Sequence, residues 1–137
     1  MIPARFLLWV DSLGGLFAGA VMFAFLDWLS ELYRLPREVV AFVATANIAY
    51  GCFSLSLALR VKRSRAIITT LSFANALWAI LCFVGAVAFW RDASMFGIAQ
   101  FVLEGVYVGY LARIEWLLRD QLVSPCVATI ASARSTG

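Results

Sequence analysis

Four long apolar segments, separated by short polar stretches, constrain this chain more than any other feature of its sequence. They cover residues 6–29, 39–59, 66–90 and 95–118. Each is long enough for the roughly 20 residues that an α-helix needs to cross about 30 Å of hydrocarbon. Because backbone groups in lipid must bond one another, helices are expected; none of the segments alternates in polarity as a β-barrel strand would. The sequence therefore predicts an all-α fold, a bundle of four transmembrane helices.

The composition leads to the same class of protein. The chain is 64% hydrophobic and 14% charged, whereas soluble domains are about 45–50% apolar and about 25% charged. A domain of 137 residues exposes too much of its surface to hide these side chains from water. We therefore expect membrane lipids to surround residues 1–118, followed by a partly disordered cytoplasmic tail at 119–137.

The connections between the apolar segments are short, which fixes the expected topology. They cover residues 30–38, 60–65 and 91–94. Short links make successive helices antiparallel neighbours. The predicted bundle therefore runs up-down-up-down, and the N-terminus, the second connection and the C-terminus lie on one side of the membrane.

The basic residues predict which side that is. The side with both termini would hold eight of them and the opposite side three, namely Arg34, Arg37 and Arg91. Cytoplasmic loops are enriched in Lys and Arg, so both termini are predicted to be cytoplasmic. The basic turn of the second connection would determine this orientation and face anionic lipid; it comprises Arg60, Lys62, Arg63 and Arg65.

Several classes of function are disfavoured by what the sequence lacks. It has no histidine, and its three cysteines form no CxxC pair, so histidine-ligated haem, zinc sites with His and a Ser-His-Asp triad are excluded. No long basic face is present to bind nucleic acid. We expect no metal and no cofactor. An enzyme is the third alternative, because no nucleophile–base pair or phosphate loop is visible.

Glu104 is the most informative single residue, because it lies near the middle of the fourth apolar segment. A charge there costs at least about 2.5–3.5 kcal/mol, and such residues usually face the bundle interior. Polar residues at a similar depth predict a buried intramembrane polar cluster: Glu104, Asn47, Asn75, Tyr50, Tyr107 and Gln100. Two interpretations stay open, namely hydrogen bonds that only join helices, and a proton, cation or ligand-headgroup site. Without a cation at its depth, Glu104 is expected to be protonated at neutral pH.

Glycine pairs spaced by four residues predict close helix packing. Gly15 and Gly19 form one GxxxG motif, and Gly105 and Gly109 form another. Such spacing lets two helix backbones approach each other.

Two further features concern Asp11 and the cysteines. Asp11 is expected to be an interfacial acid at the cytoplasmic boundary, with Arg113 as a candidate ion-pair partner. Cys52 and Cys82 are predicted to lie at depths about 10 Å apart, which is too far for a disulfide. Both are therefore expected to be free thiols.

One stretch carries a resemblance to known proteins. The segment from Glu104 to Trp116, EGVYVGYLARIEW, and the Ala-Asn pairs at Asn47 and Asn75 resemble small uncharacterised bacterial four-helix inner-membrane proteins. The resemblance implies the topology and a multi-pass location in the cell inner membrane. It implies no activity and no ligand.

These observations lead to two functional hypotheses. The first is a non-enzymatic integral membrane protein that binds a partner membrane protein, another copy of itself as a homo-oligomer, or lipid. The alternative is a small oligomeric transporter or channel in which Glu104 titrates.

Overall fold

The computed structural model describes residues 4–60 and 64–123, which form five helices and no strands. Their bounds are α1 Ala4–Ala24, α2 Leu26–Tyr33, α3 Arg37–Leu59, α4 Arg65–Ala88 and α5 Met95–Val123. The all-α prediction is thereby confirmed. The long helices α3 and α4 lie within two residues of the predicted segments at both ends, and α5 extends past the predicted end at 118 to Val123.

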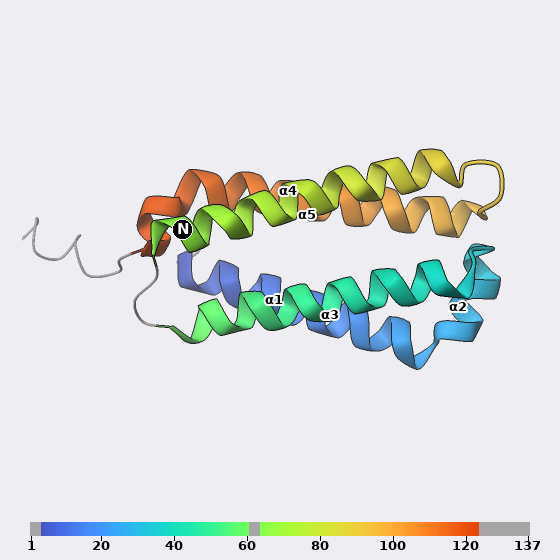
Figure 1. The fold of residues 1–137 in the computed structure, drawn as a ribbon, viewed down its shortest axis with the longest axis horizontal. Coiled ribbons are helices and arrows are strands. Elements are labelled where there is room, and N and C mark those ends of the chain that lie inside the picture. The colour runs from blue at the N-terminus through green and yellow to red at the C-terminus, as the bar shows by residue number, and fades with distance from the viewer. Residues whose placement is uncertain (1–3, 61–63, 124–137) are drawn as a thin grey trace, which may run out of the picture.

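The long helices pack as two pairs. α1 lies along α3, and α4 lies along α5 (Figure 1). α2 lies at the same end of the molecule as the link between α4 and α5. The start of α1, the link between α3 and α4 and the end of α5 lie at the other end (Figure 1).

Glycines allow the close approach of α1 to α3. A Cβ atom on Gly19 would lie 2.5 Å from Ile48 Cγ1 and 2.8 Å from the Ala44 carbonyl oxygen. A Cβ on Gly15 would lie 3.1 Å from the Asn47 carbonyl oxygen. In the other pair Gly105 faces Cys82 and Phe83, whereas a Cβ on Gly109 would meet only Ala79, at an ordinary 3.5 Å.

The first predicted segment is not one continuous helix, which corrects the prediction for residues 6–29. α1 ends at Ala24, and α2 begins at Leu26 with its axis turned by 88°. α2 buries Leu26 and Leu29 and carries Asp27 and Glu31 on its exposed face. This amphipathic pattern suits a helix that lies across the end of the bundle.

Apolar clusters close the bundle on both sides of its middle. At the α2 end, Met22 of α1, Ala86 of α4 and Phe101 of α5 pack with leucines and valines of the other helices. At the opposite end, Leu8 of α1 and Leu122 of α5 pack with α3 and α4 residues, among them Leu57 and Leu71. The hydrophobic contacts between the two helix pairs are therefore concentrated towards the ends.

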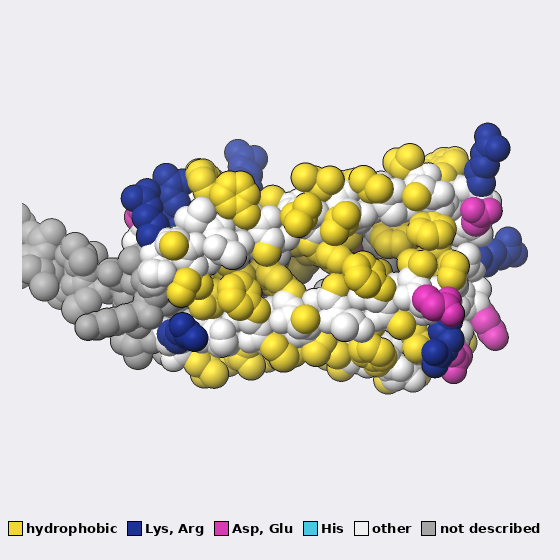
Figure 2. All heavy atoms as spheres, viewed as in Figure 1, with side chains coloured by type: hydrophobic (Ala, Val, Ile, Leu, Met, Phe, Trp, Pro, Cys, Tyr) yellow, Lys and Arg dark blue, Asp and Glu magenta, His cyan; other side chains and the backbone are white. Residues whose placement is uncertain are grey.

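The surface is that of a membrane protein. α3, α4 and α5 are each long and apolar enough to span a membrane, and α1 with α2 makes a fourth span if the bent pair is counted as one. Large apolar side chains cover the sides of the bundle, whereas charged side chains gather towards its two ends (Figure 2). Phe17, Val87 and Met95 are 73%, 78% and 83% exposed, as expected for residues that face lipid.

Part of the predicted basic turn is visible. Arg60 and Arg65 are exposed, and Arg65 lies 3.3 Å from Asp120 in a surface ion pair. Lys62, Arg63 and the tail from residue 124 onward, with its predicted disorder, lie outside the described residues.

Candidate functional site

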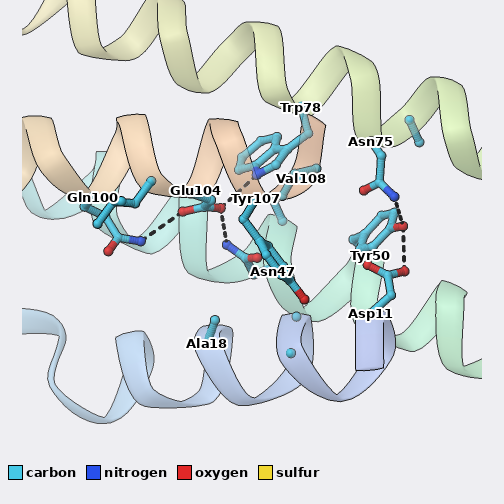
Figure 3. Close-up of a pocket in the computed structure, with 15 residues that line it drawn as sticks. Asp11, Ala18, Asn47, Tyr50, Asn75, Trp78, Gln100, Glu104, Tyr107 and Val108 are labelled. Carbon is cyan, nitrogen blue, oxygen red and sulfur yellow. Dashed lines mark hydrogen bonds between the residues drawn. The ribbon is translucent and has the colours of Figure 1, made fainter. Parts of the chain in front are cut away.

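A cavity of about 450 Å³ lies between the two helix pairs, midway along the bundle. A hollow opens between the pairs in the space-filling view (Figure 2), and Figure 3 shows side chains reaching into it. The lining residues come from all four long helices: Asp11, Gly14, Gly15, Ala18, Ala46, Asn47, Tyr50, Ala74, Asn75, Trp78, Gln100, Leu103, Glu104, Tyr107 and Val108.

Glu104 is held on the cavity wall by three N–H donors from three helices. Asn47 Nδ2 and Trp78 Nε1 each donate to Glu104 Oε1 over 2.8 Å, and Gln100 Nε2 donates to Oε2 over 3.0 Å (Figure 3). We call these four residues the Glu104 cluster. The donors come from α3, α4 and α5, so the cluster joins both helix pairs and fixes the direction of the carboxyl group.

A second polar network crosses the bundle through Asp11. The hydroxyls of Tyr50 and Ser54 donate to Asp11 Oδ2 over 2.8 and 2.6 Å. Asn75 Nδ2 donates to the Tyr50 hydroxyl oxygen and, over 2.9 Å, to Glu115 Oε2. We call this set the Asp11 chain. It runs from α1 through α3 and α4 to α5 and links the pairs a second time.

Glu115 ends the Asp11 chain with one oxygen unpartnered. Glu115 is 0% exposed, and its Oε1 has no hydrogen-bond partner among the described residues. A buried acceptor without a partner is costly. Because Glu115 does not line the cavity, the polar interior of this bundle extends beyond the cavity wall.

Small residues and aromatic rings shape the cavity. Gly14, Gly15 and Ala18 form its floor on α1, where larger side chains would fill the space. Tyr107 reaches down from α5 so that its hydroxyl would lie 3.1 Å from a Cβ on Gly14 (Figure 3). Trp78 lies on the opposite wall, with its ring centroid 6.0 Å from that of Phe42.

The cavity is lined by acidic residues and by no basic residue. Its lining contains two acidic side chains, Asp11 and Glu104, and no Lys, Arg or His. In the part of the chain with described side chains, the ion pairs are Arg37 with Asp27 and Arg65 with Asp120, both at the surface. No group of three His, Cys, Asp or Glu side chains among the described residues could hold a metal ion.

The structure divides the predicted polar cluster into two parts. Glu104, Gln100 and Asn47 bond one another in the Glu104 cluster. Tyr50 and Asn75 belong to the Asp11 chain. Tyr107 lines the cavity between them (Figure 3).

The sequence interpretation of Asp11 was wrong. Asp11 is 3% exposed and bonds Tyr50 and Ser54, whereas Arg113 is exposed. Asp11 is therefore an interior residue, because two hydroxyl donors from α3 satisfy a carboxyl group that was expected at the lipid boundary. Of the cysteines, Cys52 is exposed, Cys82 is buried and both are free; Cys126 lies outside the described residues.

Three other residues of these networks, Ser54, Glu115 and Trp78, were missed, and for Glu115 a signal was present. Glu115 follows Glu104 by eleven residues, which is three helical turns plus about 20°. The two carboxyl groups therefore lie on one face of α5, and that periodicity could have revealed Glu115. Trp78 lies in the middle of α4, and its bond to Glu104 depends on the relative rotation of α4 and α5.

No protein-family model, curated protein or solved structure matches this chain. The resemblance to small bacterial inner-membrane proteins therefore stays a prediction.

Proposed function

We propose that this chain is a non-enzymatic integral membrane protein that binds one small amphiphilic molecule in the cavity between its helix pairs. It would cross the inner membrane four times, up-down-up-down, with both termini in the cytoplasm. The observation that carries the proposal is a cavity with aromatic rings and two carboxyl groups in its walls, which lies between the two apolar clusters.

The size and lining of the cavity support a binding role. Ligand sites commonly have volumes of about 300–1,000 Å³, with mostly apolar and aromatic walls and a few directed polar groups. The 450 Å³ cavity combines Trp78 and Tyr107 with a carboxyl group that three donors hold in place. Groups that are oriented before the ligand arrives reduce the entropic cost of binding.

A purely structural role explains these features less well. Helix association in lipid depends on close packing and small residues, and α1 and α3 pack in that way through Gly19. Between the pairs the chain instead places alanine and glycine next to Asp11 and Glu104. Leucine at these positions would fill the space, so the small residues keep it open.

Native mass spectrometry of protein purified in a mild detergent tests the proposal. We expect wild type to retain a small molecule that gentle activation removes. Ala18→Leu, which fills the cavity, should abolish retention, whereas the matched Ala20→Leu on the exposed face of α1 should not. Bare polypeptide from wild type, or equal retention by both variants, would contradict binding in this cavity.

Transport is the second candidate, because carboxyl groups lie inside the bundle at two depths. Glu104 and Glu115 are separated by about 16 Å along α5, and Asp11 is tied to Glu115 through Tyr50 and Asn75. Such a series is typical of proton and ion pathways. Solute flux in proteoliposomes that disappears in Glu104→Gln would favour a transporter, and stable binding without flux would favour the binding protein.

A further inference from the structure

We infer that the ligand of this cavity is an organic cation, a substituted ammonium with apolar groups, and that Glu104 and Trp78 recognise its charged centre. The inference rests on the proposed binding function and specifies the chemistry of the ligand. It goes beyond the general proton, cation or headgroup site that the sequence suggested.

The charged residue types in the cavity wall are all acidic. Asp11 and Glu104 contribute two carboxyl groups, and no basic side chain lines the cavity to neutralise them. None of the arginines whose side chains are described lines the cavity, and Arg113, which lies within α5, is exposed. A phosphate or carboxylate in the ligand would face two carboxyl groups and would find no basic partner in the cavity lining. The ligand should therefore carry positive charge without a compensating anion.

Aromatic rings form part of the cavity lining. Trp78 donates its Nε1 hydrogen to Glu104 and so keeps its indole ring next to the carboxyl group. Tyr50 and Tyr107 present further rings to the same space (Figure 3). Aromatic faces attract cations within about 6 Å of the ring centroid, and quaternary ammonium groups are bound in this way.

The groups bonded to Glu104 suit an organic cation better than a metal ion. Ca²⁺ and Mg²⁺ require several oxygen ligands, but the groups nearest to Glu104 are N–H donors of Asn47, Trp78 and Gln100. These N–H groups orient the carboxyl group and cannot themselves ligate a metal ion. The cavity volume of about 450 Å³ also exceeds what one ion needs.

The test compares two probes of equal shape that differ in charge. Benzyltrimethylammonium is cationic, and neopentylbenzene is its neutral carbon isostere. Protein labelled with 5-fluorotryptophan in lipid nanodiscs should give five fluorine resonances, one for each tryptophan. Loss of one resonance in Trp78→Phe assigns the reporter in the cavity, and the other four resonances report on the fold.

We expect benzyltrimethylammonium to shift the Trp78 resonance saturably, with an apparent affinity at least about tenfold above that of neopentylbenzene. Glu104→Gln should remove this preference and leave the response to neopentylbenzene unchanged. Equal affinities for both probes in wild type would overturn the cation inference and leave the binding function standing. No shift with either probe would contradict the proposed binding function itself. The comparison on wild type requires no variant to fold.

Discussion

Asn75 Nδ2 lies 2.9 Å from Glu115 Oε2, and both side chains are buried between α4 and α5. The same nitrogen also donates to the Tyr50 hydroxyl oxygen of α3. One amide group thus joins three helices and both helix pairs. It also supplies the hydrogen bond that Glu115 receives within the described part of the chain.

Asn75→Ala should lower the free energy of unfolding by about 1–3 kcal/mol, because it would leave both Glu115 oxygens buried without a donor. Thr70→Ala is the matched control on α4, since Thr70 is exposed and bonds only the Ala66 carbonyl of its own helix; its effect should stay within about 0.5 kcal/mol. Unfolding in mixed detergent micelles measures both. Equal effects would show that the Asp11 chain does not join the helices.

The two GxxxG motifs should respond differently to alanine. Gly19→Ala would place a methyl group 2.8 Å from the Ala44 carbonyl oxygen, so α1 and α3 must separate, at a cost of about 1–3 kcal/mol. Gly109→Ala meets only Ala79 at 3.5 Å and should be neutral or stabilising by up to about 1 kcal/mol through helix propensity. Thermal unfolding in detergent distinguishes them, and an equal loss in both would refute the packing described for α5.

Much of this fold could be predicted from the sequence, because long runs of apolar residues are recognisable by residue type alone and must be helical in lipid. The break at Phe25 could not. The residues around it include no glycine or proline, and the turn depends on α2 burying Leu26 and Leu29 against the end of the bundle.

The candidate site was predictable only in part. Asn47, Gln100 and Glu104 stand out as polar residues at one depth, which is a property of position along the chain. Asp11 bonds Tyr50 and Ser54, and Trp78 bonds Glu104, only because of how the helices are rotated and paired. Residue spacing does not encode that rotation and pairing. They are decided by packing in three dimensions, such as that of Gly19 against Ile48.

The topology prediction is tested by reporter fusions. Fusions after Gly137 and within residues 60–65 should report the cytoplasm, and one within 91–94 should report the opposite side. Neutralising Lys62, Arg63 and Arg65 together should produce mixed orientations. A cytoplasmic signal from 91–94 in the parent protein would contradict the predicted orientation.

The most direct test of cation binding at Glu104 is a distance measured in lipid bilayers. Protein carrying ¹³C in its glutamate carboxyl groups would be combined with ¹⁵N-labelled benzyltrimethylammonium, and the dipolar coupling between the two nuclei recorded by solid-state NMR. We predict a coupling that corresponds to an ammonium nitrogen within about 4–6 Å of one carboxyl carbon, and its loss in Glu104→Gln. A bound probe that shows no coupling, or a coupling that persists in Glu104→Gln, would contradict the account.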